Sequence, residues 1–204
     1  MAKALGIIDP QIGFINGSLP VPMAAEDMNA LSDYMTDTNC QQYDAKIVSI
    51  DFHPWNHCSF KSQGGEWKDH CIAHTVDAAV WPQLEPALFK THGDVYFLTK
   101  GQKQNVEEYS LFKCKESAEK FQKIAEDYSI TEIDICGIVR EICVLNTIKD
   151  LHALYPAMKV NVLMRYTPTM DAGTAFQQYA DENPWLNLII LTVYRFNALV
   201  HLVR

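Results

Sequence analysis

Histidines and one aspartate gather in the segment DFHPWNHCSF and in the loop after it. Asp51 and His53 are two residues apart, so their side chains fall on the same side if a strand extends to them. His57 follows four residues later, and His70 comes after a further loop. One carboxylate and two or three imidazoles suit Zn²⁺, Fe²⁺ or Mn²⁺, with positions left open. Each histidine alone is more typical of an ordinary loop or packing residue, but the pattern as a whole favours a metal site.

A second set of reactive residues consists of Asp9, Lys100 and Cys143. A thiol attacks an amide carbonyl well only as the thiolate, so it needs a base or a positive neighbour. Cys143 lies in the first turn of a predicted helix, where the helix dipole favours an anion. Asp9 could accept the thiol proton, and Lys100 could hold both groups in their charged forms. A buried inert cysteine, a turn carboxylate and a solvated lysine are the alternative, which these residues alone leave open.

Short apolar runs, mostly β-branched or aliphatic, alternate with segments of helical periodicity. This alternation predicts an α/β fold, a three-layer α/β/α sandwich around a mainly parallel sheet of about six strands. The predicted strands are Ala4–Ile8, Ile47–Ile50, Val95–Leu98, Ile133–Ile138, Val160–Met164 and Leu186–Leu191, and the predicted helices are Ala24–Met35, Glu116–Tyr128 and Glu141–Leu154.

The carboxyl ends of these strands are expected to meet at one crevice, where open α/β sheets bind ligands. Asp9, Asp51, Lys100 and Val139 all lie at such ends. The segments Asp51–Lys90 and Gly101–Lys115 read as long irregular loops. Loops of this length in compact domains are usually functional or disordered, and the first is rich in His, Trp and Cys. We therefore expect it to carry function.

The chain has 204 residues, 48% of them apolar, and a formal net charge of −8. This size suits a single domain over residues 1–204. The negative balance and the lack of a basic stripe disfavour nucleic acid or a membrane as partner and favour a small molecule. No secretory signal is apparent, and the six scattered cysteines do not resemble a disulfide framework. We therefore expect a cytoplasmic protein with reduced thiols, which leaves room for a reactive cysteine.

Five segments, in order, resemble the signature blocks of nicotinamidases in the isochorismatase-like cysteine hydrolase superfamily. They are ALGIIDPQIGFINGSLPVP, DFHPWNHCSF, WKDHCI, FLTKG and GIVREICVLNT, and the resemblance runs from Ala4 to roughly Gly173. It implies a metal-dependent amidohydrolase that converts nicotinamide to nicotinate and ammonia through a cysteine thioester, serves NAD salvage and also accepts pyrazinamide. The alternatives are a related amidohydrolase for another small amide or carbamoyl compound, and a metal-stabilised binding protein. A pure binder would need no triad, and a homo-oligomer is left open.

The resemblance also implies a role for each residue of the site. Asp9, Lys100 and Cys143 match the catalytic triad. Asp51, His53 and His70 match the ligands of one divalent metal, expected to be zinc with iron or manganese as alternatives, and His57 matches a position that is a ligand in some members only. Phe14 and Trp67 match aromatic walls around the pyridine ring, Tyr109 would close the pocket, and the backbone N–H groups of Val139 and Cys143 would hold the oxyanion. In the family the peptide before the first of these two is cis, here Ile138–Val139.

Two regions depart from the family pattern. Many relatives read Thr-Asp-x-Cys before the nucleophile, whereas this chain has Arg140 and Glu141. We expect Glu141 to cap the helix start, and Arg140 to reach solvent or an acidic group across an oligomer interface. Residues 192–204 form an atypical apolar C-terminal extension, whose polar residues Arg195, Asn197 and His201 disfavour a membrane span. An extra core strand or an interface segment is expected there.

Overall fold

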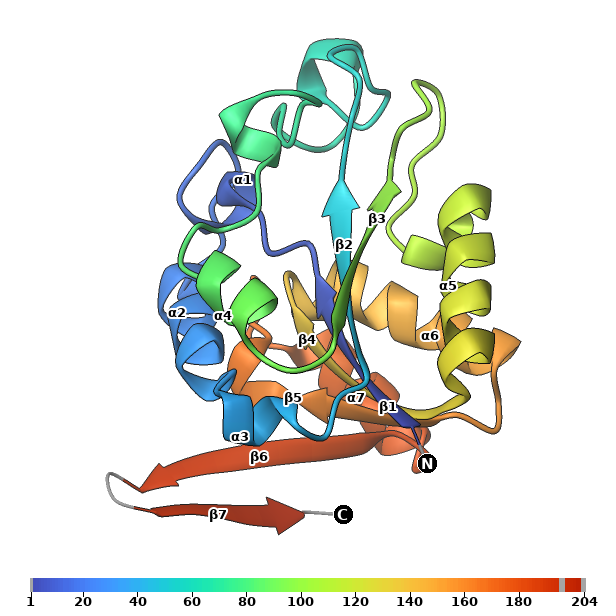
Figure 1. Ribbon diagram of the computed structural model, residues 1–204. Helices are drawn as coiled ribbons and strands as arrows, with labels where there is room; N and C mark the ends of the chain where they lie inside the picture. The colour runs from blue at the N-terminus through green and yellow to red at the C-terminus, as the bar shows by residue number, and fades with distance from the viewer. Residues whose placement is uncertain (1, 195–196, 203–204) are drawn as a thin grey trace.

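The computed structural model describes residues 2–194 and 197–202, with side-chain surroundings for residues 2–190. One sheet has the strand order β3-β2-β1-β4-β5-β6-β7 (Figure 1). Neighbouring strands from β3 to β6 pair in parallel, and β7 pairs antiparallel with β6. The strands are β1 (Ala2–Ile8), β2 (Ala45–Asp51), β3 (Asp94–Lys100), β4 (Ile130–Gly137), β5 (Lys159–Leu163), β6 (Asn187–Tyr194) and β7 (Asn197–Leu202).

Helices cover both faces of the sheet, in the three layers that the sequence predicts (Figure 1). One layer contains α1, α2 and α4, and the other contains α5, α6 and α7. The helices are α1 (Ile12–Ile15), α2 (Ala24–Tyr34), α3 (Asp37–Cys40), α4 (Glu85–Lys90), α5 (Lys115–Tyr128), α6 (Leu145–Leu154) and α7 (Thr174–Glu182).

The central strand β1 shows how the sequence builds two cores. Successive side chains of a strand point to opposite faces of a sheet. Leu5 and Ile7 accordingly join the core under α2 and α4, whereas Ala4 and Ile8 join the core under α5, α6 and α7. All four are buried, which accounts for the continuous apolar run in the sequence.

The predicted strands are confirmed, and the described residues contain four helices beyond the three predicted ones: α1, α3, α4 and α7. The loop Asp51–Lys90 ends in a short helix, α4, and the helix α7 follows β5, where the sequence indicated none. The C-terminal extension contributes an extra strand, β7, at the edge of the sheet and not at its centre. Residues 195–196 and 203–204 of that extension lie outside the described residues.

The sheet order reverses direction beside β1, because β2 lies on one side of it and β4 on the other. Such a switch point opens a crevice at the carboxyl ends of the strands. At this place Gly137 closes β4 with a φ of 114°, and a Cβ there would collide with the backbone of Ile8. Only glycine fits both constraints, so the residues after β1 and β4 can approach each other closely.

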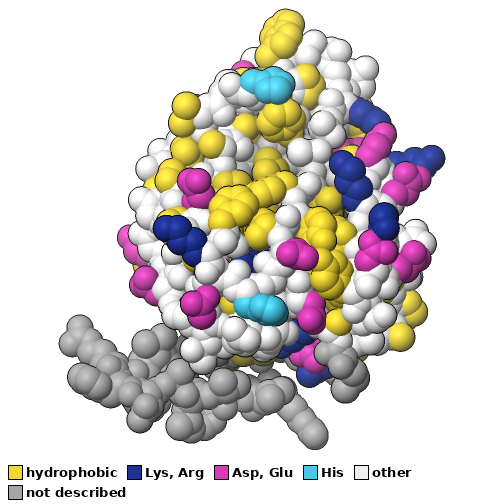
Figure 2. Space-filling model, viewed as in Figure 1, with side chains coloured by type: hydrophobic (Ala, Val, Ile, Leu, Met, Phe, Trp, Pro, Cys, Tyr) yellow, Lys and Arg dark blue, Asp and Glu magenta, His cyan; other side chains and the backbone are white. Residues whose placement is uncertain are grey.

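Charges of both signs mix over α5 on the face that Figure 2 shows. Lys115 pairs with Glu119 and Lys123 pairs with Asp127, each one helical turn apart. Exposed pairs of this kind add little stability. Within residues 2–194 and 197–202, no helix is both long and apolar enough to cross a bilayer.

Candidate active site

A buried lysine, Lys100 at the end of β3, connects the reactive side chains. Its ammonium nitrogen lies 2.9 Å from Asp9 Oδ2 and 2.5 Å from Asp51 Oδ1. It also donates to Cys143 Sγ at 3.7 Å. Asp9 follows β1, Asp51 ends β2, and Cys143 lies in a π-helical turn, Arg140–Val144, that leads into α6. The structure therefore brings the predicted triad together and places the metal candidate Asp51 directly beside it.

Asp9 is held in place by the neighbouring strand. Ser49 Oγ donates to Asp9 Oδ1 at 2.7 Å and accepts from the Asp9 backbone N–H at 3.1 Å. Apart from the ammonium of Lys100, the other oxygen, Oδ2, has no hydrogen-bond donor among the described residues. One carboxylate oxygen of Asp9, one of Asp51 and the sulfur of Cys143 lie within 4.8 Å of one another.

Burial and the neighbouring charges shift the pKa values of the side chains in this cluster. Burial raises the pKa of Asp9 above its ordinary value, although Lys100 opposes the shift. Burial likewise raises the pKa of the Cys143 thiol, against the opposing effect of Lys100. The resting thiol therefore keeps its proton, and Asp9 is a stronger base than an ordinary carboxylate.

The pKa of Asp51 shifts in the opposite direction, below its ordinary value. Burial alone would raise its pKa, but Lys100 and His53 outweigh burial and hold the pKa below its ordinary value. Burial would also lower the pKa of Lys100, yet the two carboxylates hold it well above its ordinary value. Asp51 therefore stays ionised, as a carboxylate that ligates a metal must.

Acceptor atoms of Asp51, His53 and His70 lie within 4.8 Å of one another. His53 Nδ1 is 2.9 Å from the carbonyl of Gly101, and His70 Nδ1 is 2.7 Å from the carbonyl of Lys68. A carbonyl only accepts, so each Nδ1 carries a proton and Nε2 is the ring nitrogen that could ligate a metal. His53 Nε2 is buried without a hydrogen-bond partner in the described part of the chain. These residues fit a divalent metal ion, and the carbonyls act as outer-shell partners.

His57 differs from the prediction that it joins the metal ligands. Its Nδ1 lies 2.7 Å from Ser59 Oγ, and its Nε2 lies 3.0 Å from the Val106 carbonyl. Both ring nitrogens are therefore engaged, and the ring stacks beside His53 with 4.1 Å between centroids. His57 packs against the cluster and does not contribute an atom to it.

Several residues that position the cluster escaped the sequence reasoning. Gln11 is fully buried and donates to the Asp51 carbonyl at 2.7 Å, while its side-chain oxygen accepts from the Asp51 N–H at 2.7 Å. Glu108 accepts from the N–H of Gly101, the residue whose carbonyl orients His53. Gln11 follows Asp9-Pro10 in the first signature block, which is the one sequence signal that could have identified it.

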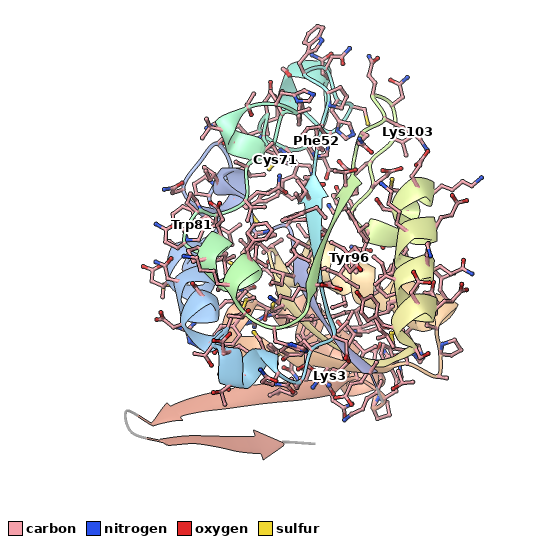
Figure 3. The ribbon with its side chains drawn as sticks, viewed as in Figure 1. Lys3, Phe52, Cys71, Trp81, Tyr96 and Lys103 are labelled. Carbon is pink, nitrogen blue, oxygen red and sulfur yellow. The ribbon has the colours of Figure 1, made fainter. Side chains whose placement is uncertain are left out.

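The loop that carries His70 is pinned to β2 and to α1. The N–H of His53 donates to the carbonyl of Cys71, whose side chain lies near α1 and the end of β2 (Figure 3). Asp77 then accepts from the N–H of Cys71 at 2.7 Å and from the N–H and hydroxyl of Ser18 at 2.9 and 2.7 Å. A single carboxylate therefore joins the loop after α1 to the loop with His70.

A pocket that is partly open to solvent is lined by Cys143. Most of its wall is apolar, and Phe14, Trp67 and Tyr109 line it as predicted. The Trp67 indole N–H donates to the Tyr109 hydroxyl at 2.9 Å, which fixes both rings. Other lining residues are Leu19, Val21, Asp51, His70, Glu107, Val139, Ile142 and Met170.

The residues before the nucleophile are arranged differently from our expectation. The Ile138–Val139 peptide is cis, as the resemblance implies. Arg140 does not extend into solvent, because its guanidinium donates to the carbonyls of Thr167 and Met164 in its own chain. The carboxylate of Glu141 accepts from backbone N–H groups of the loop before α7 and does not cap its own helix.

Asp77→Ala should lower the free energy of unfolding by about 1–2 kcal/mol at neutral pH, because three donors lose a charged acceptor at a half-buried site. Partial burial would raise the pKa of Asp77, but hydrogen bonds from Ser18 and Cys71 hold it below its ordinary value. The contribution is therefore present above the unfolded pKa, about 3.9, and is lost as pH falls through the folded value. Urea denaturation at neutral pH and near pH 3 measures this difference.

The exposed residue Asp127 provides the matched control, because Asp127→Ala removes only a surface ion pair. This change should alter stability by no more than about 0.5 kcal/mol. Equal losses for the two variants, or a loss for Asp77→Ala that does not shrink in acid, would contradict the role of Asp77 as a link between the loops.

No protein-family model matches this chain. The Escherichia coli nicotinamidase is 30% identical over 179 residues, covering 79% of this chain and 80% of the relative.

Solved structures share the fold. The pyrazinamidase of Pyrococcus horikoshii in complex with zinc superposes with a TM-score of 0.76 and 23% identity over 92% of this chain and 98% of that one. The L. infantum protein PnC1 in complex with nicotinate gives a TM-score of 0.78 and 22% identity over 92% and 91%. The Escherichia coli relative, at 30% identity and with 80% of its length covered, shows that the chain belongs to the nicotinamidase family.

Proposed function

We propose that this chain hydrolyses nicotinamide to nicotinate and ammonia. The observation that carries the proposal is the contact of one buried ammonium, Lys100 Nζ, with Asp9, Asp51 and Cys143 beside an aromatic pocket. A relative named nicotinamidase and a neighbour bound to nicotinate support the same substrate. A planar aromatic amide fits a pocket lined by Phe14 and Trp67, because flat rings stack favourably on aromatic faces.

The acylation step begins with a proton transfer from the Cys143 thiol to Asp9 Oδ2. The thiolate sulfur attacks the amide carbon, and a C–S bond forms. The tetrahedral intermediate collapses when the C–N bond breaks, and Asp9 returns its proton to the departing nitrogen, which leaves as ammonia. Lys100 stabilises the negative charge as it moves between the carboxylate and the sulfur.

Deacylation repeats the same chemistry with water. Asp9 takes a proton from a water molecule, and the oxygen attacks the thioester carbon. The C–S bond then breaks, nicotinate forms, and the sulfur recovers its proton from Asp9. In both steps the negative oxygen would be held by the backbone N–H groups of Val139 and Cys143, two residues that line the pocket.

We further propose that Asp51, His53 and His70 hold a divalent metal, with zinc expected because imidazole and carboxylate suit it. A zinc complex of a protein with the same fold supports this choice. Bound there, such an ion would supply a Lewis acid at this end of the pocket. His53 and His70 keep their ring orientation through the carbonyls of Gly101 and Lys68, so the site is ready for the ion.

We also propose that the enzyme serves NAD salvage, because it releases nicotinate. Pyrazinamide has the same carboxamide on a similar ring and should also be a substrate. We propose a cytoplasmic enzyme that acts on small molecules, without nucleic acid or membrane as partner. A second candidate, an amidohydrolase for a different small amide or carbamoyl compound, uses the same triad and would differ in the pocket.

Cys143→Ala should abolish ammonia release from nicotinamide, with a loss of more than about a thousandfold in kcat, because no other group can form the thioester. The fold of this variant should change little, which circular dichroism can check. Cys40→Ala is the matched control, since Cys40 lies in α3 away from the pocket. Retention of a tenth of wild-type activity by Cys143→Ala would exclude Cys143 as the nucleophile.

His53→Ala and His70→Ala should lose bound metal, because each removes a free Nε2 from the cluster. His57→Ala should cause only a milder loss, because both of its ring nitrogens already have partners. Elemental analysis of the purified variants gives the metal-to-protein ratio. Full occupancy in His53→Ala would contradict the site, and equal losses in all three would restore His57 as a ligand.

Nicotinamide should be hydrolysed far better than benzamide if the metal binds the ring nitrogen. The two amides have nearly the same shape, and Phe14 and Trp67 would stack on either ring. Benzamide lacks the nitrogen that aims the carboxamide at Cys143, and a misplaced reacting group can cost about a hundredfold. Steady-state kcat/KM values for both compounds decide the question, and similar values would favour the second candidate function.

A further inference from the structure

The segment between β5 and α7 forms part of the pocket wall although its sequence matches no expected site residue. Met170 in this segment lines the cavity beside Cys143, and its side chain is 45% exposed. A half-exposed methionine has three rotatable bonds and no fixed shape of its own. Its position in the wall therefore depends on how its backbone is held.

Two residues just before the nucleophile hold this backbone. The guanidinium of Arg140 donates to the Thr167 carbonyl at 2.8 Å and to the Met164 carbonyl at 3.2 Å. Its backbone N–H donates to the Pro168 carbonyl at 3.0 Å. Arg140 therefore anchors the first half of the segment to the turn that carries Cys143.

Glu141 holds the second half. Its Oε1 accepts from the N–H of Met170 at 2.6 Å and from the N–H of Asp171 at 3.0 Å. Charge-assisted hydrogen bonds of this kind are roughly twice as strong as neutral ones. The segment then turns on itself, because Asp171 Oδ1 accepts from the N–H of Gly173 at 2.7 Å. Glu141 is thus the side chain that fixes Met170 relative to Cys143.

We infer that Glu141 is a positioning residue that holds Met170 as the wall limiting the size of the substrate ring. The inference rests on the proposed function, because the ring in question is that of nicotinamide. It assigns Met170 as a specificity determinant against nicotinamides that carry an added ring substituent. Arg140 and Glu141 therefore connect the unusual sequence before the nucleophile to substrate choice.

Met170→Ala should relax this limit. One extra methyl group in a tight pocket changes discrimination by about tenfold or more. We expect the ratio of kcat/KM for 5-methyl- or 6-methylnicotinamide to that for nicotinamide to rise about tenfold in the variant. Met23→Ala is the matched control, since Met23 is exposed and does not line the pocket. Unchanged ratios for both methylated amides would overturn the assignment of Met170.

Glu141→Ala and Glu141→Gln test the positioning role. Glu141→Ala should raise the ratio of kcat/KM for the methylated nicotinamides to that for nicotinamide. It should also speed hydrogen exchange at the backbone amides of Met170 and Asp171. Glu141→Gln should restore both properties in large part, because an amide oxygen can still accept the two hydrogen bonds. Glu119→Ala, on the exposed face of α5, is the control and should change neither.

Hydrogen exchange and the ratio of kcat/KM values together distinguish a failure of the positioning role from a failure of the proposed function. Wild-type exchange rates and an unchanged ratio in Glu141→Ala would overturn the positioning role. Hydrogen exchange needs no substrate, so it tests the hold on Met170 even if the proposed function fails. A wild-type chain that releases no ammonia from nicotinamide would overturn the proposed function, and with it the role in specificity.

Discussion

The site depends on one fully buried ammonium, Lys100 Nζ, in contact with two carboxylates and a thiol. An unpaired buried charge costs several kcal/mol, so Lys100 can remain inside only while the carboxylates compensate it. Asp51 is thereby kept ionised for a metal, and the negative charge shared by Asp9 and Cys143 is stabilised whichever of them carries it. The metal half and the nucleophile half of the site are therefore electrostatically coupled through Lys100.

The fold makes this coupling possible by bringing four chain segments to one place. Asp9 directly follows β1, β2 and β3 end at Asp51 and Lys100, and the turn after β4 supplies the sulfur of Cys143. These strands are adjacent in the sheet, so their carboxyl ends lie side by side. Gly137 permits the close approach of β4 to β1, and Gln11 fixes the backbone of Asp51 at the end of β2. The sheet thus fixes the distances between the reactive side chains more precisely than a single loop could.

Strand positions could be predicted from the sequence because apolar runs follow local rules, whereas Asp9, Lys100 and Cys143 were assigned as a triad only through the family resemblance. His57 was placed among the ligands because spacing and resemblance cannot show that Ser59 and Val106 engage both ring nitrogens. Arg140 and Glu141 were misjudged for a similar reason, since their partners lie more than twenty residues away in the chain. Ser49 and Gln11 have common residue types whose role appears only after folding. Local patterns therefore identify reactive groups better than the residues that hold them.

The central claim is that Cys143, made reactive by Asp9 and Lys100, attacks the amide carbon of nicotinamide. The most direct measurement is rapid acid quenching during the first turnover, followed by digestion and mass spectrometry of the cysteine-containing peptides. We predict a nicotinoyl group on the peptide with Cys143 and on none of the peptides with the other cysteines. Formation of nicotinate in that turnover with Cys143 unmodified throughout, or a nicotinoyl group on another residue, would contradict the account.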